Sequence, residues 1–334
     1  MLIAGPNLTI DRTATLPELR PGEVLRFDRV VVTPGGKGLN VARAARALGV
    51  EALLAGFVPG ETGRAAAGMI GREGVALRSV PCRGELRSTA IVMEHGGRTT
   101  VLNEPGPRIS ADEWAAYEAA IAEEIDGHGV LVCSGSVPPG SPEDAYARLT
   151  AIAVGAGCRC VVDAAGTTLA RALEAHPDVV CPNIVEAEEA LGAVRAQPVR
   201  SSSGAEPRAP GAVRAHPVRS SAGAEDRALV VAAALVARGA KGAIVTADAA
   251  GAAVASSDGE RAWLPAPRIT EVRNPIGAGD VLASALAAAL ERGEPLLEAA
   301  RRGVAAAAAS VEWPTAGELD AARADELLLA VRAG

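Results

Sequence analysis

Short apolar runs alternate with longer, alanine-rich amphipathic runs through most of this chain. The apolar runs cover residues 51–58, 129–135, 158–166, 178–183 and 241–248. Strands that alternate with helices of about 10–15 residues indicate a parallel sheet covered on both faces. From Gly277 onward the sequence is mostly helical in pattern. The chain is therefore predicted to form an α/β three-layer sandwich around a mostly parallel central sheet.

Two stretches depart from this rhythm, because polar and apolar residues alternate along them. They are residues 23–33 and 87–103, and the second contains His95-Gly96-Gly97 as a hairpin turn. A period of two within an α/β chain indicates a small separate β layer with one solvated face. We predict that about 12–33 and 86–104 form a β-sheet lid over the main sheet.

A repeated segment interrupts the pattern. Residues 193–206 recur as residues 212–225, with 12 of 14 positions identical. Two copies are too few to stack as a solenoid, and the segment has little to bury. We interpret 193–225 as a mobile insertion within a single domain, 1–334. It is either a duplication in a surface loop or an arm that binds a partner.

The overall charge excludes some classes of partner. The 33 basic and 40 acidic residues give a net charge of −7, which disfavours a general nucleic-acid binder. No apolar run has the roughly 20 residues that cross a membrane. The first residues lack the basic start of a signal peptide. The five cysteines match no zinc or disulfide framework. We expect a soluble cytoplasmic protein with reduced thiols and neither nucleic acid nor membrane as a partner.

The strongest local motif is NPIGAGDVLASALAAAL, residues 274–290. Small residues lead into a long helix that begins near Ala278, and a helix N-terminus favours an anion. The backbone N–H groups of Gly277, Ala278 and Gly279 could therefore surround a phosphoryl group. Asp280 in the first turn could accept a proton from an attacking hydroxyl. It could also simply cap the helix.

A second glycine-rich entry to a helix lies in TPGGKGLNVARAARALG, residues 33–49. It matches neither the Walker loop nor the dinucleotide fingerprint. A lysine among glycines at a helix start can bind phosphate as a point charge. Lys37 carries more weight because the chain has only one other lysine, Lys241. Asn40 follows in the first turn of the same helix.

These two motifs, in this order and about 240 residues apart, resemble the two signatures of the PfkB (ribokinase-like) carbohydrate kinase family. Further landmarks follow in the family's order. They are PNLTIDRT (6–13), TVLNEPGPRIS (100–110), SGSVPPG (134–140), DAAG (163–166), PNIVEAE (182–188) and VEWPTAGELD (311–320). The resemblance runs essentially end to end and implies a ribokinase-like fold. The GGKG, NEPGP and SGSVPPG segments are most similar to those of the hexose-phosphate kinases.

The resemblance implies a catalytic role for four residues of the helix motif. Asp280 would be the base that acts on the acceptor hydroxyl, and the N–H groups of Gly277, Ala278 and Gly279 would form the anion hole. The sugar phosphate would be bound by Asp11, Gly36, Lys37, Asn40, Arg87 and Ser136. Within that set, Asp11 would bind sugar hydroxyls, whereas Lys37 and Arg87 would supply the cationic contacts to the phosphate.

The nucleotide side is implied in the same way. Its residues would be Asn183, Thr246, Gly251, Gly277 and Gly279. Asn183 and Glu186 form an NxxE pair, which in this family orders Mg²⁺ through water near the nucleotide phosphates. The expected cofactors are thus Mg²⁺ and ATP as phosphate donor. Two positions depart from the family pattern, with Cys181 where a lysine is frequent and Asp248 where a glycine is common.

The implied reaction is phosphoryl transfer from ATP to a hexose phosphate, with fructose 1-phosphate as the leading acceptor. Fructose 6-phosphate and tagatose 6-phosphate follow closely. Other hypotheses are a kinase of an unphosphorylated sugar or nucleoside, and a non-catalytic sugar-phosphate sensor. Lids of this family often pair across a dimer, so we also expect a homodimer through the β lid.

Overall fold

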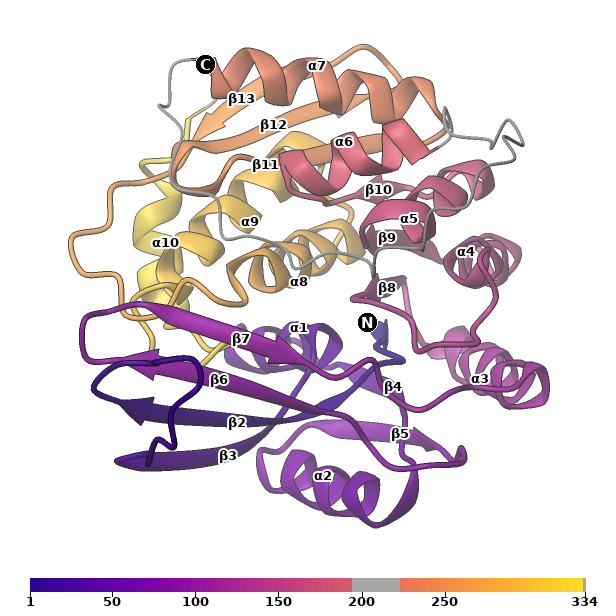
Figure 1. Cartoon of the computed structure of the whole chain (residues 1–334). Helices are drawn as coiled ribbons and strands as arrows, with labels where there is room; N and C mark the ends of the chain where they lie inside the picture. The colour runs from indigo at the N-terminus through magenta and orange to yellow at the C-terminus, as the bar shows by residue number, and fades with distance from the viewer. Residues whose placement is uncertain (194–222, 333–334) are drawn as a thin grey trace, which may run out of the picture.

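The computed structural model describes residues 1–193 and 223–332. In that part of the chain, nine strands form one large sheet (Figure 1). Their spatial order is β13 (Arg261–Pro265), β12 (Gly251–Ser256), β11 (Gly242–Thr246), β10 (Val179–Val180), β9 (Arg159–Asp163), β8 (Val130–Ser134), β1 (Leu2–Ala4), β4 (Leu53–Phe57) and β5 (Ala76–Val80). Neighbours pair in parallel from β5 to β11, and β12 and β13 add antiparallel pairs at one edge. The mostly parallel sheet is confirmed.

Helices cover both faces of this sheet. One face carries α1 (Lys37–Ala47), α2 (Gly60–Arg72), α8 (Ala278–Glu291), α9 (Leu296–Ser310) and α10 (Ala321–Leu328). The other carries α3 (Ala111–Glu124), α4 (Ala145–Gly155), α5 (Gly166–Ala172), α6 (Ile184–Ala193) and α7 (Ala224–Ala237). Short 3₁₀ turns lie at Ile125–Gly127, Leu173–Ala175 and Asp248–Ala250.

Alternation along the central strands divides the core into two layers. Ile3 packs in the cluster on the α1 and α8 side, whereas Leu2 and Ala4 pack in the cluster on the α3 to α7 side. Successive side chains of a strand point to opposite faces, so a strand with helices on both faces is apolar throughout. The three-layer α/β/α prediction is therefore confirmed.

A second sheet lies apart from the first (Figure 1). Its order is β3 (Arg29–Gly35), β2 (Thr9–Leu16), β6 (Ser88–Glu94) and β7 (Thr99–Asn103). The expected hairpin is present, since the Gly97 N–H donates to the Glu94 carbonyl. The sheet is longer than the predicted 12–33, because β2 already pairs with β3 at Thr9 and Gly35. Asp11 lies within β2.

The topology fixes where polar side chains gather. The chain continues from β1 to β4 on one side and later to β8 on the other, so the strand order reverses between β1 and β8. Ligands of open α/β sheets bind outside the carboxyl ends of the strands at such a point. Ser134 and Asp163 are the last residues of β8 and β9, and both point to this edge.

The repeated segment lies almost wholly outside the described residues. Residues 223–225 of its second copy are described, and α7 begins among them at Ala224. The five cysteines carry no disulfide, and four of them are buried. Over residues 1–193 and 223–332, no helix is both long and apolar enough to cross a membrane.

Candidate active site

The start of α8 brings backbone donors and a carboxyl group together. Gly277, the N-cap residue, has φ 87°, a conformation that side chains disfavour. A Cβ there would also lie 3.2 Å from Ala316 and from the Gly317 nitrogen. A Cβ at Gly279 would meet no atom within 4 Å, so this side of the helix start is open. Asp280 completes the first turn and is only 4% exposed.

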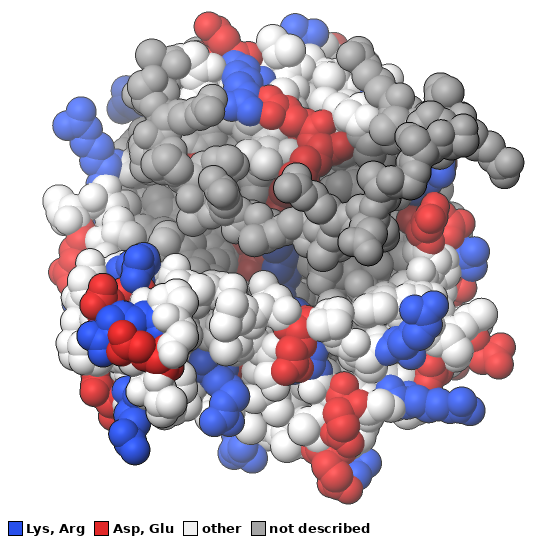
Figure 2. All heavy atoms as spheres, in the orientation of Figure 1, with Lys and Arg blue, Asp and Glu red and all other residues white. Residues whose placement is uncertain are grey.

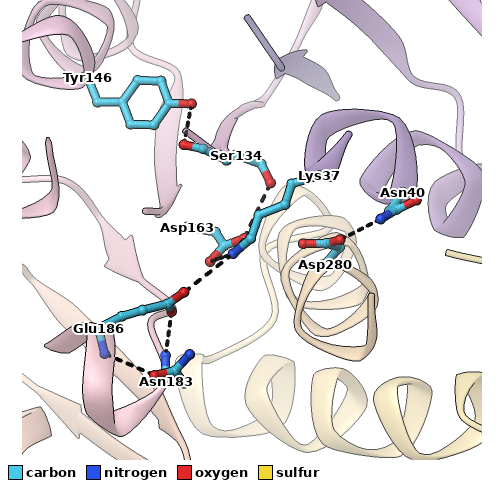
Figure 3. A network of polar contacts seen from close by, with 9 residues as sticks. Lys37, Asn40, Ser134, Tyr146, Asp163, Asn183, Glu186 and Asp280 are labelled. Atoms are coloured by element: carbon cyan, nitrogen blue, oxygen red, sulfur yellow. Dashed lines mark hydrogen bonds and ion pairs between the residues drawn. The ribbon is translucent and has the colours of Figure 1, made fainter. Parts of the chain in front are cut away.

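Within residues 1–193 and 223–332, Asp280 has one hydrogen-bond partner. The Asn40 Nδ2 donates to its Oδ2 at 2.8 Å, as Figure 3 shows. Burial raises the pKa of Asp280 to about 7, against the opposing influence of Lys37 and Asn40. The carboxylates of Asp163 and Glu186 raise it further. The group is thereby placed where it can both hold and release a proton near neutral pH.

Lys37 begins α1 directly after Gly36, whose φ of 111° suits glycine alone. Its Nζ lies 3.3 Å from Asp163 Oδ2 and 3.8 Å from Glu186 Oε1. Partial burial opposes its charge, but Asp163, Asp280 and Glu186 together raise the pKa of Lys37 above its ordinary value. One cation thus faces three carboxyl groups (Figure 3), and its side chain remains 41% exposed.

Asp163 is a site residue that the sequence prediction missed. It accepts hydrogen bonds from Lys37 and from the Ser134 Oγ, the latter at 3.3 Å. Behind it, the Tyr146 hydroxyl donates to the Gly135 carbonyl at 3.0 Å. Its position at the carboxyl end of a buried strand, in the DAAG landmark, was the signal that could have identified it.

Asn183 and Glu186 close the opposite side through a reciprocal pair of bonds. The Asn183 N–H donates to Glu186 Oε2 at 3.0 Å, and the Glu186 N–H donates to Asn183 Oδ1 at 2.9 Å. Burial raises the pKa of Glu186, although Lys37 opposes this. The predicted nucleotide residue Thr246 forms a parallel bridge with Asn183. Gly251, at φ 138°, starts β12 a few residues farther on.

A second polar group surrounds Asp11 on β2. A Cβ on Gly35, on the neighbouring strand β3, would collide with the Asp11 carboxylate, so only glycine leaves room for this side chain. Asp11 Oδ1 is buried with no hydrogen-bond partner among the described residues, as is Asn7 Oδ1. Burial raises the pKa of Asp11, and Arg87 opposes this. Two unpartnered acceptors are costly, and sugar hydroxyls could satisfy both.

Arg87 stands beside this group. Its guanidinium donates to the backbone carbonyls of Leu8, Asn7 and Glu104 at 3.1–3.4 Å. A hollow of about 240 Å³ adjoins it, lined by Glu85, Leu86, Arg87, Glu104, Pro105, Gly106 and Pro107. Ser136, another predicted substrate residue, accepts from Asn7 Nδ2 at 2.9 Å. Asn7 therefore belongs to this group, although the sequence prediction did not include it.

The predicted residues thus form two groups that α1 connects. Asp280, Asn40, Lys37, Asn183 and Glu186 make the first group. Asp11, Arg87 and Ser136 make the second, and Gly36 packs on its edge because a Cβ there would lie 3.3 Å from the Asn7 carbonyl. In the structure, the Lys37 ammonium faces the carboxylates of the first group. Over the rest of the visible face, acidic and basic side chains are interspersed (Figure 2).

The two departures from the family pattern have local explanations. Cys181 is buried, and burial raises the pKa of its thiol, so it behaves as a small apolar residue. Asp248 has φ 51°, in the left-handed region. This backbone is one that glycine adopts without strain and that aspartate tolerates better than most residues. The position therefore keeps its turn despite the change.

The comparisons with known proteins agree with this geometry. The chain matches the pfkB family carbohydrate kinase over residues 7–321. Escherichia coli phosphofructokinase-2 in complex with fructose-6-phosphate is 25% identical, with a TM-score of 0.81 over 99% of this chain and 98% of that chain.

Two further structures are similar in fold. A possible 1-phosphofructokinase from Thermotoga maritima is 21% identical, with a TM-score of 0.79 over 100% of this chain and 98% of that chain. Arabidopsis thaliana ribokinase, complexed with ribose and ATP, is 18% identical, with a TM-score of 0.71 over 98% of both chains. Because the family match covers nearly the whole chain and spans both glycine-rich helix starts, this protein belongs to the pfkB family of carbohydrate kinases.

Proposed function

We propose that this sugar kinase transfers the γ-phosphoryl group of ATP to a hydroxyl of a hexose phosphate. One observation carries the proposal. Asp280 is a buried carboxyl group in the first turn of α8, directly after N–H groups whose outer side is open at Gly279. A site for a charged phosphoryl group and a group that can accept a proton are therefore adjacent.

The reaction follows from this adjacency. Asn40 occupies Asp280 Oδ2, so Oδ1 is left to accept the proton of the acceptor hydroxyl. The hydroxyl oxygen attacks the γ-phosphorus, and the bond from that phosphorus to the bridging oxygen breaks as ADP leaves. The N–H groups of Gly277, Ala278 and Gly279 stabilise the charge on the transferred phosphoryl group. Such preorganised donors act most strongly where water is excluded.

The residues around Lys37 fit a magnesium–nucleotide complex. Three carboxyl groups, those of Asp163, Glu186 and Asp280, face one ammonium group, which leaves an excess of negative charge. No cluster of three or more potential metal ligands occurs within residues 1–193 and 223–332. Mg²⁺ commonly keeps several water ligands and binds substrate phosphates. Glu186 and Asn183 would hold it through water, where it would screen the phosphate charge.

The preference for a phosphorylated acceptor rests on the cations of the site. Arg87 makes its hydrogen bonds to backbone carbonyls, so its positive charge is not neutralised by a hydrogen-bonded carboxylate in the described structure. The adjoining hollow could take a phosphate, because the nearby carboxylates of Asp11 and Glu104 only partly offset the burial of this cation. We infer fructose 1-phosphate as the first acceptor. Fructose 6-phosphate is the second, because the similar Escherichia coli enzyme was solved with it.

The second sheet fits the role of a lid. β2 carries Asp11 toward the site, so movement of this sheet would bring a sugar contact with it. Its other strands expose apolar side chains, including Val30, Val32 and Leu102 at 41%, 41% and 59%. An exposed apolar sheet is a liability unless it is covered. A homodimer through this lid would cover it, which sedimentation of the purified protein can test.

An acceptor panel tests the proposed function. ADP release with Mg-ATP is measured against fructose 1-phosphate, fructose 6-phosphate, tagatose 6-phosphate, fructose and ribose. Asp280→Asn is the test variant, and the exposed Asp325→Asn on α10 is its matched control. We expect preference for one sugar phosphate, lost in the first variant and kept in the second. Turnover on free sugars alone would reject the phosphate-binding role of Arg87 and Lys37.

A further inference from the structure

One buried arginine, Arg43 on α1, lies behind the proposed base. Its side chain is only 4% exposed, and all five of its N–H donors are used. Nε and Nη2 donate to the two carboxylate oxygens of Glu73 at 2.7 and 2.8 Å. Nη2 also donates to the Pro34 carbonyl at 2.8 Å. Nη1 donates to Asn40 Oδ1 at 3.1 Å and to the Ala316 carbonyl at 3.5 Å.

These contacts join the segments that build the site. Pro34 precedes Gly35 and Gly36, which leave room for Asp11 and start α1. Ala316 packs against Gly277, since a Cβ on that glycine would lie 3.2 Å from it. A guanidinium with every donor occupied has a single orientation. Arg43 is therefore a fixed point between the two glycine-rich motifs.

The contact with Asn40 has a consequence for proton transfer. A guanidinium can only donate hydrogen bonds, so Asn40 must present its carbonyl oxygen to Arg43. The amide nitrogen is then turned toward Asp280 Oδ2. If the amide flipped, two donors would meet at Arg43 and two acceptors would meet at Asp280. Arg43 thus decides which end of Asn40 faces the carboxyl group.

We propose that Arg43 is a positioning residue that favours the ionised, proton-accepting form of Asp280 by fixing the orientation of the Asn40 amide. This inference rests on the proposed role of Asp280 as the base. Arg43 itself is buried with its donors used by protein groups, so it would act through Asn40. Other charged groups also face Asp280, namely Lys37 from α1, Asp163 from the end of β9 and Glu186 from α6. They are unchanged by a substitution at position 43.

The test is the pH dependence of kcat/KM for the preferred sugar phosphate. In Arg43→Lys, the single ammonium nitrogen pairs with Glu73 and no longer donates to Asn40 Oδ1, so the amide of Asn40 is free to turn. A carbonyl oxygen that faces Asp280 then disfavours the charge of that carboxyl group. We expect the acidic limb of the profile to move up by about one pH unit, a tenfold change in proton affinity. Glu73→Gln, which weakens the support of the same guanidinium, should move it in the same direction by less.

Two further variants separate positioning from general damage. Arg46 lies one turn farther along α1, is half-exposed and pairs with Glu318. The substitution Arg46→Lys should therefore leave the acidic limb of the pH profile in place. In an Asn40→Ala background, which removes the connecting amide, neither Arg43→Lys nor Glu73→Gln should shift the limb any further. If Arg43→Lys does not fold, the test uses Glu73→Gln in the wild-type and Asn40→Ala backgrounds. The comparison shows whether the shift of the acidic limb depends on Asn40.

The inference is overturned if the acidic limb of kcat/KM in the folded Arg43 or Glu73 variants lies at the wild-type pH. It is also overturned if these variants shift the limb equally in the Asn40→Ala background. Failure of the proposed function would give a different result. The pH profile of the wild-type protein would then have no acidic limb that depends on Asp280. Thermal unfolding of each variant reports the purely structural loss separately.

Discussion

Asn40 Nδ2 lies 2.8 Å from Asp280 Oδ2, although 240 positions separate the two residues. The first residue belongs to the helix that follows GGKG, and the second to the helix that follows GAGD. A second bond joins the same helices, from the Ser284 hydroxyl to the Val41 carbonyl at 2.9 Å. The two glycine-rich segments are therefore parts of one site.

The first prediction concerns activity and pH. With the pKa of Asp280 raised to about 7 by burial, the base is ionised above that pH and protonated below it. We expect kcat/KM to fall about tenfold for each unit of pH below the limb. The pH profile of the wild-type protein checks this. A profile that stays flat down to about pH 5 would contradict the proposed base.

The same group affects stability with the opposite sign. Because the pKa of Asp280 rises from 3.8 to about 7 on folding, the folded state binds the extra proton between these values. Its contribution to the free energy of unfolding is full below pH 3.8 and is lost as the pH rises through about 7. Between pH 5 and pH 8 the wild type should lose this part of its free energy of unfolding, whereas Asp280→Asn should not. The variant should therefore become more stable relative to the wild type over this range. Urea unfolding at both pH values measures the difference, and equal pH slopes would refute it.

A third prediction concerns Arg87. Arg87→Lys keeps the positive charge but removes the planar guanidinium. That group contacts several carbonyls and could bind a phosphate through two N–H donors. We expect KM for the sugar phosphate to rise about tenfold, as loss of roughly 1.4 kcal/mol of binding would produce. Arg83→Lys on the exposed preceding turn is the control. An unchanged KM in the Arg87 variant would remove it from the substrate site.

A fourth prediction concerns Gly35, which leaves space for Asp11. A methyl group in Gly35→Ala would collide with the Asp11 carboxylate and displace it from the sugar side. We expect KM for the acceptor to rise about tenfold or more, with KM for ATP much less affected. Gly71→Ala in α2 is the matched control, because a Cβ there meets nothing within 4 Å and alanine favours helix. Equal effects on both Michaelis constants would argue against a specific role for Asp11.

Much of the site could be predicted because its motifs are local. A glycine-rich turn and the helix that it starts are contiguous in sequence, so both motifs could be located from the residues alone. The roles of Lys37, Asn40, Asp280 and the Asn183–Glu186 pair are implied by the family resemblance and stay predictions. The central sheet could be predicted for the same reason, since its strands are continuous apolar runs.

Arg43 and Asn7 could not be assigned in this way. Each acquires its role from partners far along the chain, such as Glu73 or Ser136. The strands of the small sheet also extend a few residues beyond about 12–33, because β2 pairs with β3 from Thr9 and Gly35 onward. A pattern within one segment does not predict which distant segments that segment contacts.

The central claim is that Asp280 accepts the proton while the γ-phosphoryl group moves to a sugar phosphate. The most direct measurement follows single-turnover transfer from labelled ATP to fructose 1-phosphate and fructose 6-phosphate, in wild type and in Asp280→Asn. Binding of each sugar phosphate is measured on the same samples. We predict transfer slowed by about a thousandfold in the variant, with binding largely kept. Transfer within tenfold of wild type in the variant, or none to either sugar phosphate in the wild type, would contradict the claim.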